Sequence, residues 1–267
     1  MVVVPELDFK KTVEEIVSFI REVVEDAKAS GIVIGLSGGV DSSLTAALCV
    51  EALGENKVLG VMMPTYFTPK EDMEDARQLA EHLGIETKLI DISDVCEAFF
   101  KALHANRQDS EMRIPMGNVG VRVRMTLLYY YANTRNYLVA GPSDRSEALI
   151  GYFTKYGDGG ADLYPIVHLY KTQVRELAKN LGVPERISYK PSSPQIYPGH
   201  KATDELPVDY DKLDRMLVGL FDRRLSPEET SLLTGASIKT VDEVLLRFNR
   251  SEHKRSFPPM VKRWRLD

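Results

Sequence analysis

The sequence is poor in cysteine. Among its 267 residues only Cys49 and Cys96 are cysteines, which is too few for a disulfide framework or a four-cysteine zinc site. Cys49 falls within an apolar helical pattern, which predicts a small core residue. Sparse cysteine is typical of a reducing, intracellular compartment, and we expect a cytoplasmic protein.

Long apolar runs are also missing. No stretch of about 18 apolar residues is present, so no membrane-spanning helix is expected. The N-terminal MVVVPELDFKK lacks the basic start and the long apolar middle of a signal peptide. We therefore expect no membrane as a partner.

The chain has no excess of positive charge. It carries 34 basic and 39 acidic residues, a net charge of −5, whereas a dedicated nucleic-acid binder usually shows a basic excess. The C-terminal residues from Arg250 to Asp267 are an exception, with six basic and two acidic residues. Two interpretations stay open for them, a solvated basic end or a clamp for a phosphate-bearing ligand.

Hydrophobic residues make up 43% of the chain, which is enough for a sizeable core. Four short β-rich runs alternate with helical patterns, at 31–36, 57–62, 86–92 and 137–141. This alternation indicates parallel βαβ units, and near-continuous apolar strands fit a sheet that is covered on both faces. The sequence therefore predicts an α/β fold with a doubly wound, Rossmann-like parallel sheet.

The helical patterns and their end signals divide the rest of the chain. Thr68 is an expected N-cap ahead of Pro69, and Ser93 an expected cap for the next helix. Helices are predicted at 41–53, 69–83, 118–134, 144–150, 171–181, 209–223, 226–233 and 237–249, with a loop at 190–208. No repeat or long linker is found. We expect one domain over 1–267, with a core at about 25–185, C-terminal helices at about 209–250 and a basic tail at 251–267.

The strongest local signal is Ser37-Gly-Gly-Val-Asp-Ser-Ser43, which follows a strand and opens a helix. Glycines let the backbone N–H groups approach an anion, and the helix N-terminus favours negative charge. Asp41 would repel phosphate by itself, so it fits as a ligand to Mg²⁺. The alternative is a plain turn in which Asp41 caps the helix. The loop is neither a Walker P-loop nor a GxGxxG motif.

This loop resembles the SGGxDS loop of the adenine-nucleotide α-hydrolase superfamily, whose members cleave ATP to AMP and pyrophosphate. A second segment at 151–162, GYFTKYGDGGAD, is dense in glycine, aromatic and charged residues. Its composition predicts an ordered loop, either a binding site or a surface loop with turn glycines.

The second segment resembles the GFFTKxGDGGAD fingerprint of ammonia-dependent NAD synthetases, and the likeness extends to Ser251-Glu-His-Lys-Arg255. The resemblance implies a carbon–nitrogen ligase that converts deamido-NAD, ATP and ammonia to NAD, AMP and pyrophosphate with Mg²⁺, as a homodimer. It implies the fold of the α-hydrolase type. The chain has too few residues for an added glutaminase module, so free ammonia or ammonia from a separate protein is expected.

The resemblance also implies roles for individual residues. Asp158 would hold ammonium and take its proton, and Lys171 would stabilise the leaving pyrophosphate. Asp41 and Glu147 would bind Mg²⁺. ATP would contact Gly35, Leu36, Ser37, Gly38, Gly39, Val40, Asp41, Ser42, Pro142, Lys171 and Ser193. Deamido-NAD would contact Arg122, Lys155, Asp162, His253 and Lys254. The loops at 152–162 and near 190–205 would order over the substrates.

Two stretches depart from the family pattern. Pro142 stands where the family has threonine, which removes a hydroxyl and a backbone N–H; Ser143 is a possible replacement. In the later loop Ser193 keeps the expected hydroxyl, but Gln195 replaces an acid and Ala202-Thr203 replace an Asp-Glu pair. Asp204-Glu205 follow immediately and could restore the pair by a register shift.

These departures keep two rival functions open. One is another ATP pyrophosphatase, such as a tRNA-thiolating or amidating enzyme; acidic net charge, few cysteines and the GDGGAD segment disfavour it. The other is a non-catalytic nucleotide-binding paralogue. Asp41, Glu147, Asp158 and Lys171 are all present, which favours an active synthetase.

Overall fold

A four-stranded parallel sheet forms the centre of the molecule. The computed structural model describes residues 1–106, 108–193 and 195–260. The strands are β1 (Gly31–Gly35), β2 (Val58–Met62), β3 (Glu86–Leu89) and β4 (Tyr137–Val139), in the order β3-β2-β1-β4. Ile32 lies opposite Val58 on β2 and Leu138 on β4, all in parallel register. The predicted parallel α/β fold is confirmed. Strand β4 ends two residues before the end of the predicted run at 137–141.

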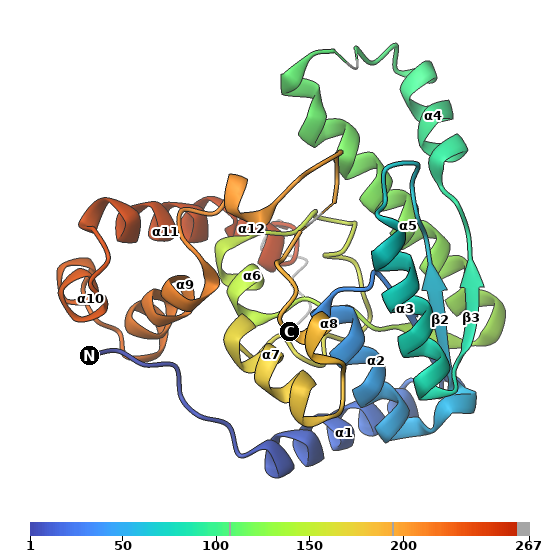
Figure 1. The fold of residues 1–267 in the computed structure, drawn as a ribbon, viewed down its shortest axis with the longest axis horizontal. Helices are drawn as coiled ribbons and strands as arrows, with labels where there is room; N and C mark the ends of the chain where they lie inside the picture. The colour runs from blue at the N-terminus through green and yellow to red at the C-terminus, as the bar shows by residue number, and fades with distance from the viewer. Residues whose placement is uncertain (107, 194, 261–267) are drawn as a thin grey trace.

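Helices cover both faces of the sheet and form a separate group at the C-terminal end (Figure 1). The longer ones are α1 (Phe9–Asp26), α2 (Val40–Leu53), α3 (Lys70–Leu83), α4 (Ser93–Ala102), α5 (Arg113–Arg135), α7 (Lys171–Asn180), α9 (Tyr210–Leu217), α10 (Pro227–Thr234) and α11 (Ile238–Arg250). The shorter ones are η1 (Glu55–Lys57), η2 (Ser110–Met112), α6 (Arg145–Ile150), α8 (Glu185–Ser188), η3 (Ala202–Asp204), the π-helical η4 (Val218–Asp222) and α12 (Glu252–Arg255).

Side-chain alternation along the strands builds two cores. Ile32 and Ile34 point to the face packed by α1, α2, α3 and α7. Val33 points to the opposite face, where it joins Leu59 and residues of α5. All three side chains are fully buried, because a sheet with helices on both faces leaves neither side to water.

Some helix starts differ from the sequence-based prediction. Helix α3 begins at Lys70 with Pro69 at the N-cap position, and the Thr68 hydroxyl instead accepts the Thr65 N–H at 2.9 Å. Ser93 is the first residue of α4 rather than its cap, and the Asp91 carboxylate accepts the Ser93 N–H at 2.8 Å. At Thr68 the hydroxyl is engaged in a local turn with Thr65, and at Ser93 the chain is already helical, so neither hydroxyl caps its helix.

The C-terminal helices have their own core of Leu213, Leu217, Val241 and Val244. Ser226 caps α10 in a reciprocal bond pair with Glu229, at the predicted start of the helix over 226–233. The N-terminus returns to this unit: Val2 is buried there, and its N–H donates to Leu233 O at 3.3 Å. Figure 1 shows the first residues running beside α10.

The order of the strands places a crevice beside β1. The chain leaves β1 toward β2 on one side, whereas β4 lies on the other. Ligands of open α/β sheets bind where the direction of the strand order reverses, at the carboxyl ends of the strands. The loop at 36–39 after β1 and the segment at 140–147 after β4 meet at this point. No helix among the described residues is long and apolar enough to cross a membrane.

Candidate active site

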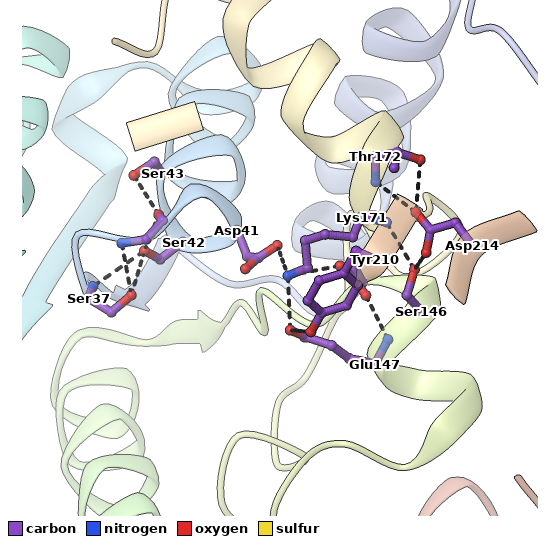
Figure 2. Close-up of polar contacts among 12 residues, drawn as sticks. Ser37, Asp41, Ser42, Ser43, Ser146, Glu147, Lys171, Thr172, Tyr210 and Asp214 are labelled. Carbon is purple, nitrogen blue, oxygen red and sulfur yellow. Dashed lines mark hydrogen bonds and ion pairs between the residues drawn. The ribbon is translucent and has the colours of Figure 1, made fainter. Parts of the chain in front are cut away.

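The loop after β1 is held in shape by its own serines. The Ser37 and Ser42 hydroxyls lie 3.1 Å apart, and the Ser43 hydroxyl donates to Gly39 O at 2.8 Å (Figure 2). Gly38 has φ +77°, and a Cβ there would lie 2.1 Å from the Asp72 carbonyl oxygen. Only glycine fits this position. The first-turn N–H groups of α2, which have no partner within the helix, are left to face a ligand.

Asp41 does not cap helix α2. Gly39 occupies the N-cap position and no side chain bonds there, which excludes a plain turn capped by Asp41. The Asp41 carboxylate turns instead to Lys171 at the start of α7, with Oδ1 2.7 Å from Nζ (Figure 2). The strand-to-helix loop thus contributes a carboxylate to the site, as the sequence suggested.

Lys171 lies at the centre of three carboxylates. Its Nζ is 2.7 Å from Asp41, 3.0 Å from Asp144 and 2.9 Å from Glu147. The Lys171 side chain is 0% exposed, although it lies at the start of a helix. Burial lowers the pKa of Lys171, but the three carboxylates outweigh burial and raise that pKa well above its ordinary value. The ammonium stays charged.

Asp144 is the member of this cluster that the sequence analysis did not assign to the site. It is the N-cap of α6, and its Oδ1 accepts the Glu147 N–H at 2.8 Å. Burial raises the pKa of Asp144 to about 6, against the opposing effect of Lys171. Burial likewise raises the pKa of Glu147 well above its ordinary range. The spacing Asp144-x-x-Glu147 resembles a helix-capping signature. This pattern is the signal in the sequence that could have identified Asp144 as a neighbour of Glu147.

A cavity of about 1470 Å³ opens beside the cluster. This exceeds the usual volume of a pocket for one small ligand. Its lining includes most of the residues predicted for ATP, deamido-NAD, Mg²⁺ and ammonium: Gly35, Leu36, Ser37, Gly38, Gly39, Val40, Asp41, Ser42, Arg122, Pro142, Glu147, Lys155, Asp158, Ser193, His253 and Lys254. Lys171 is not part of that lining, because the carboxylates of Asp41 and Glu147 stand between its ammonium and the open space.

Asp158 faces the cavity from the loop at 152–160. Its Oδ1 accepts the Thr154 N–H at 2.7 Å, which fixes the carboxylate. The side chain is exposed to the cavity. The protein atoms that surround it still remove enough water to raise the pKa of Asp158. A carboxylate with a raised pKa is suited to accept a proton.

Cationic side chains gather around the same loop. Lys155 Nζ donates to His253 O at 2.6 Å, and Arg122 Nε donates to Lys155 O at 3.3 Å. Lys254 Nζ donates to Gly151 O and Phe153 O, each at 2.7 Å. The structure therefore brings together four of the five residues predicted for deamido-NAD. His253 is exposed on α12. The last seven residues of the predicted basic tail, 261–267, lie outside the described residues.

Asp162, the fifth of these residues, lies elsewhere. Its Oδ2 accepts the Val139 N–H at 2.7 Å and its Oδ1 accepts the Tyr129 hydroxyl at 3.1 Å. It is exposed at the outer edge of β4 and does not line the cavity. A role for Asp162 in binding deamido-NAD stays a prediction from the resemblance.

The two stretches that depart from the family pattern both reach the cavity. Pro142 and Ser143 line it from the segment after β4. The Ser193 hydroxyl donates to His200 O, and the Gln195 amide donates to the Asp72 carboxylate on α3. Gln195 thus makes a contact that a carboxylate at this position could not make with Asp72. Pro194 lies outside the described residues.

A glycine- and serine-rich loop after β1, carboxyl groups after β4 and a buried lysine are the arrangement expected of a nucleotide-dependent enzyme of the ATP-pyrophosphatase type. Comparison with known proteins identifies the family. Residues 12–258 match the model of the NAD synthase family. The chain is 51% identical over 255 residues to an NH3-dependent NAD+ synthetase from Hyperthermus butylicus, covering 95% of this chain and 91% of that protein.

Solved structures agree with this family. A structure described as NMN synthetase from Francisella tularensis has a TM-score of 0.84 and 33% identity, over 96% of this chain and all of that one. An NH3-dependent NAD synthetase from Campylobacter jejuni has a TM-score of 0.79 and 32% identity, over 96% of this chain and all of that one. The chain belongs to the NAD synthase family.

Proposed function

We propose that this protein is an ammonia-dependent NAD synthetase that converts deamido-NAD, ATP and ammonia to NAD, AMP and pyrophosphate. The observation that carries the proposal is that Lys171, Asp41 and Glu147 lie together near the SGGVDS loop, beside a cavity large enough for two nucleotides. High identity to relatives of that name over nearly the whole chain supports the same activity.

In the first step the nicotinate carboxylate of deamido-NAD attacks the α-phosphorus of ATP. One carboxylate oxygen forms a bond to phosphorus, and the bond to the bridging oxygen of pyrophosphate breaks. The loop N–H groups at 38–42 and the positive charge of Lys171 stabilise the pyrophosphate as it leaves. The product is an acyl adenylate, and the chain offers its residues for binding and charge rather than as a covalent nucleophile.

In the second step ammonia attacks the acyl carbon. Asp158 takes a proton from ammonium, because only neutral ammonia has a lone pair for attack. The new carbon–nitrogen bond forms as the bond to AMP breaks, and a further proton is released as the amide becomes neutral. The raised pKa of Asp158 favours the proton transfer.

The residues of the cluster fit Mg²⁺. Three carboxylates surround one ammonium, and only Asp41 and Glu147 among them are partly exposed, at 23% and 20%, on the cavity side. No group of three or more acidic, histidine or cysteine side chains in the described ranges could hold an ion alone. Mg²⁺ commonly takes one or two carboxylates and completes its shell with phosphate oxygens and water. Bound there, it would neutralise charge on the ATP phosphates.

The remaining proposals concern the dinucleotide and the assembly. Arg122, Lys155, His253 and Lys254 would complement the pyrophosphate and the nicotinate carboxylate of deamido-NAD. Helix α5, which also carries Arg122, presents Tyr130 with 60% of its surface exposed, and this supports a homodimer formed through α5. Two buried free cysteines support a cytoplasmic location.

A second substrate has one specific observation in its favour. The Francisella tularensis structure, with a TM-score of 0.84, is described as an NMN synthetase. Nicotinic acid mononucleotide carries the same nicotinate carboxylate and would be amidated by the same two steps. Its smaller size would leave part of the cavity unfilled, so we favour deamido-NAD.

The test is product formation from Mg²⁺-ATP with each acceptor in turn, with and without ammonium, in wild-type protein and in Asp158→Ala. We expect NAD to form from deamido-NAD only with ammonium, at a rate that falls by about 10²-fold or more in the variant. Preferred conversion of nicotinic acid mononucleotide would instead assign the second substrate. ATP binding without amidation of either acceptor would contradict the proposal.

A further inference from the structure

Asp214 on α9 is a buried carboxylate outside the residues assigned to the reaction. Its side chain is 0% exposed. Oδ1 accepts the Ser146 hydroxyl at 2.5 Å, and Oδ2 accepts both the Thr172 N–H at 2.9 Å and the Thr172 hydroxyl at 2.8 Å. Figure 2 shows the carboxylate reaching to both residues from one side of the lysine cluster.

The two partners of Asp214 adjoin the residues of the active site. Ser146 directly precedes Glu147 on α6, and Thr172 directly follows Lys171 on α7. The Ser146 hydroxyl also accepts the Lys171 N–H at 3.0 Å. One carboxylate therefore ties together the first turn of α6 and the first turn of α7.

A negative charge on the Asp214 carboxylate is energetically unfavourable because the side chain is fully buried. Burial raises the pKa of this carboxyl, against the lowering effect of the Ser146 and Thr172 hydrogen bonds. Its hydrogen-bond donors within the described ranges are neutral groups, and each of them stands next to Glu147 or Lys171. An apolar side chain would pack α9 against α6 and α7 without the desolvation of a charge. The arrangement is explained if the spacing of the two helix starts matters.

We propose that Asp214 is a positioning residue: by holding Ser146 and Thr172, it sets the distance and orientation between Glu147 and Lys171. The C-terminal helical unit thereby controls the geometry of the active site in the α/β core. The proposal rests on the proposed function, because Lys171 and Glu147 act in that reaction. Small misplacements of groups that act on a reacting phosphate reduce turnover strongly.

The experiment compares Asp214→Asn and Ser146→Ala with the wild-type enzyme. The amide introduced by Asp214→Asn keeps the side-chain volume but turns an NH₂ group toward one of the donors. Ser146→Ala removes the link to the Lys171 N–H while Thr172 stays bonded. We expect kcat to fall about 10- to 100-fold in each, with KM for ATP and for deamido-NAD within about threefold. The double variant should lose little more than either single one, because both break the same chain of hydrogen bonds.

The matched controls are Ser226→Ala and Thr172→Ser. Ser226 caps α10 in the same C-terminal unit, and its hydrogen bonds with Glu229 stay within the start of that helix, so its variant should lower the Tm and leave kcat unchanged. Thr172→Ser keeps both donors to Asp214 and should retain wild-type kcat.

Three results would overturn the positioning role: folded Asp214→Asn with wild-type kcat, an equal loss of kcat in Ser226→Ala, or fully additive losses in the double variant. Failure of the proposed function is distinguishable, because it would appear as absence of NAD formation in the wild-type enzyme.

Discussion

At the scale of single residues, charge decides what the active site can bind. Asp41, Asp144 and Glu147 place three carboxylates around the Lys171 ammonium. Removing one partner from a buried ion pair leaves an uncompensated charge. Three carboxyl groups around one ammonium are consistent with a divalent cation on the cavity side, and the lysine holds them close to one another while opposing the effect of burial on the pKa values of Asp144 and Glu147.

Lys171→Met tests the lysine. We expect kcat to fall by at least about 10²-fold, because positive charge beside the leaving pyrophosphate is lost. The melting temperature should also fall, since the carboxylates then repel one another. Steady-state kinetics and thermal unfolding measure the two effects. Lys179→Met, which alters an exposed lysine on the same helix, is the control and should retain activity. A Lys171→Met enzyme with activity within threefold of wild type would contradict the role.

Gly38→Ala tests the shape of the phosphate loop. Its methyl group would meet the Asp72 carbonyl, 2.1 Å away, in a left-handed backbone. We expect ATP affinity to fall at least tenfold, measured by calorimetry. Gly54 has φ +81° with nothing within 4 Å of its added Cβ. Gly54→Ala therefore carries only the backbone strain of a region that glycine alone favours, about 1–3 kcal/mol, and should bind ATP normally. Equal ATP affinities in both variants would argue against the steric account.

At the scale of elements, helix α3 links the phosphate loop to the later loop at 190–196. Asp75 on α3 accepts Arg186 Nε at 2.8 Å and Lys190 Nζ at 2.7 Å. Lys190 also pairs with the carboxylate of Asp72, whose backbone carbonyl lies against Gly38. Burial raises the pKa of Asp75, but the hydrogen bonds from Lys190 and Arg186 prevail and lower it below its ordinary value.

Asp75→Asn should weaken this link. Because the folded-state pKa of Asp75 lies below the unfolded value, its stabilising effect is present above the unfolded pKa and disappears as pH falls through the folded pKa. We expect a loss of about 1–3 kcal/mol at pH 7, which shrinks as the pH falls below about 4, the unfolded-state pKa of an aspartate. Urea unfolding at these pH values measures it. The control Glu74→Gln, on the exposed face of α3, should change the midpoint little. A loss independent of pH would contradict the assignment.

The local signals of the sequence predicted most elements and much of the site. The strand–loop–helix around Asp41 and the caps at Ser226 and Ser237 are short-range features, so a linear pattern reveals them. Helix α1 received no assignment, although Asp8 caps it and Ile16, Ile20 and Val24 form an apolar stripe. Asp214 was not expected in the site, because its partners lie 42 and 68 residues away. Only the packing of α9 on α6 and α7 brings them together.

At the scale of the whole molecule, the protein combines a parallel α/β core with a C-terminal helical unit that also holds the N-terminus. The cavity takes its lining from both, with the phosphate loop on one side and α12 on the other. Exposed apolar side chains are left on α5 and α10, including Tyr130 and Leu232. Because α5 also carries Arg122 of the cavity lining, we expect a second copy to cover the face of α5 that presents Tyr130.

Tyr130→Asp tests the proposed dimer. Sedimentation of the wild-type protein should give twice the 30.0 kDa mass of the chain. A carboxylate at 130 would have to be desolvated in an α5 interface, so the variant should dissociate at least tenfold more readily. Leu232→Asp alters an 82% exposed residue on α10 and should leave the mass unchanged. A wild-type monomer, or a dimer broken only by the α10 variant, would refute an α5 interface.

The central claim is that the nicotinate carboxylate is activated by direct transfer to the α-phosphorus of ATP in this cavity. Deamido-NAD labelled with ¹⁸O in both carboxylate oxygens, turned over with ammonium and Mg²⁺-ATP, tests it most directly by mass spectrometry of all products. We predict one labelled oxygen in AMP, one in the amide of NAD and none in pyrophosphate. Label in pyrophosphate or in inorganic phosphate, or unlabelled AMP, would contradict the account.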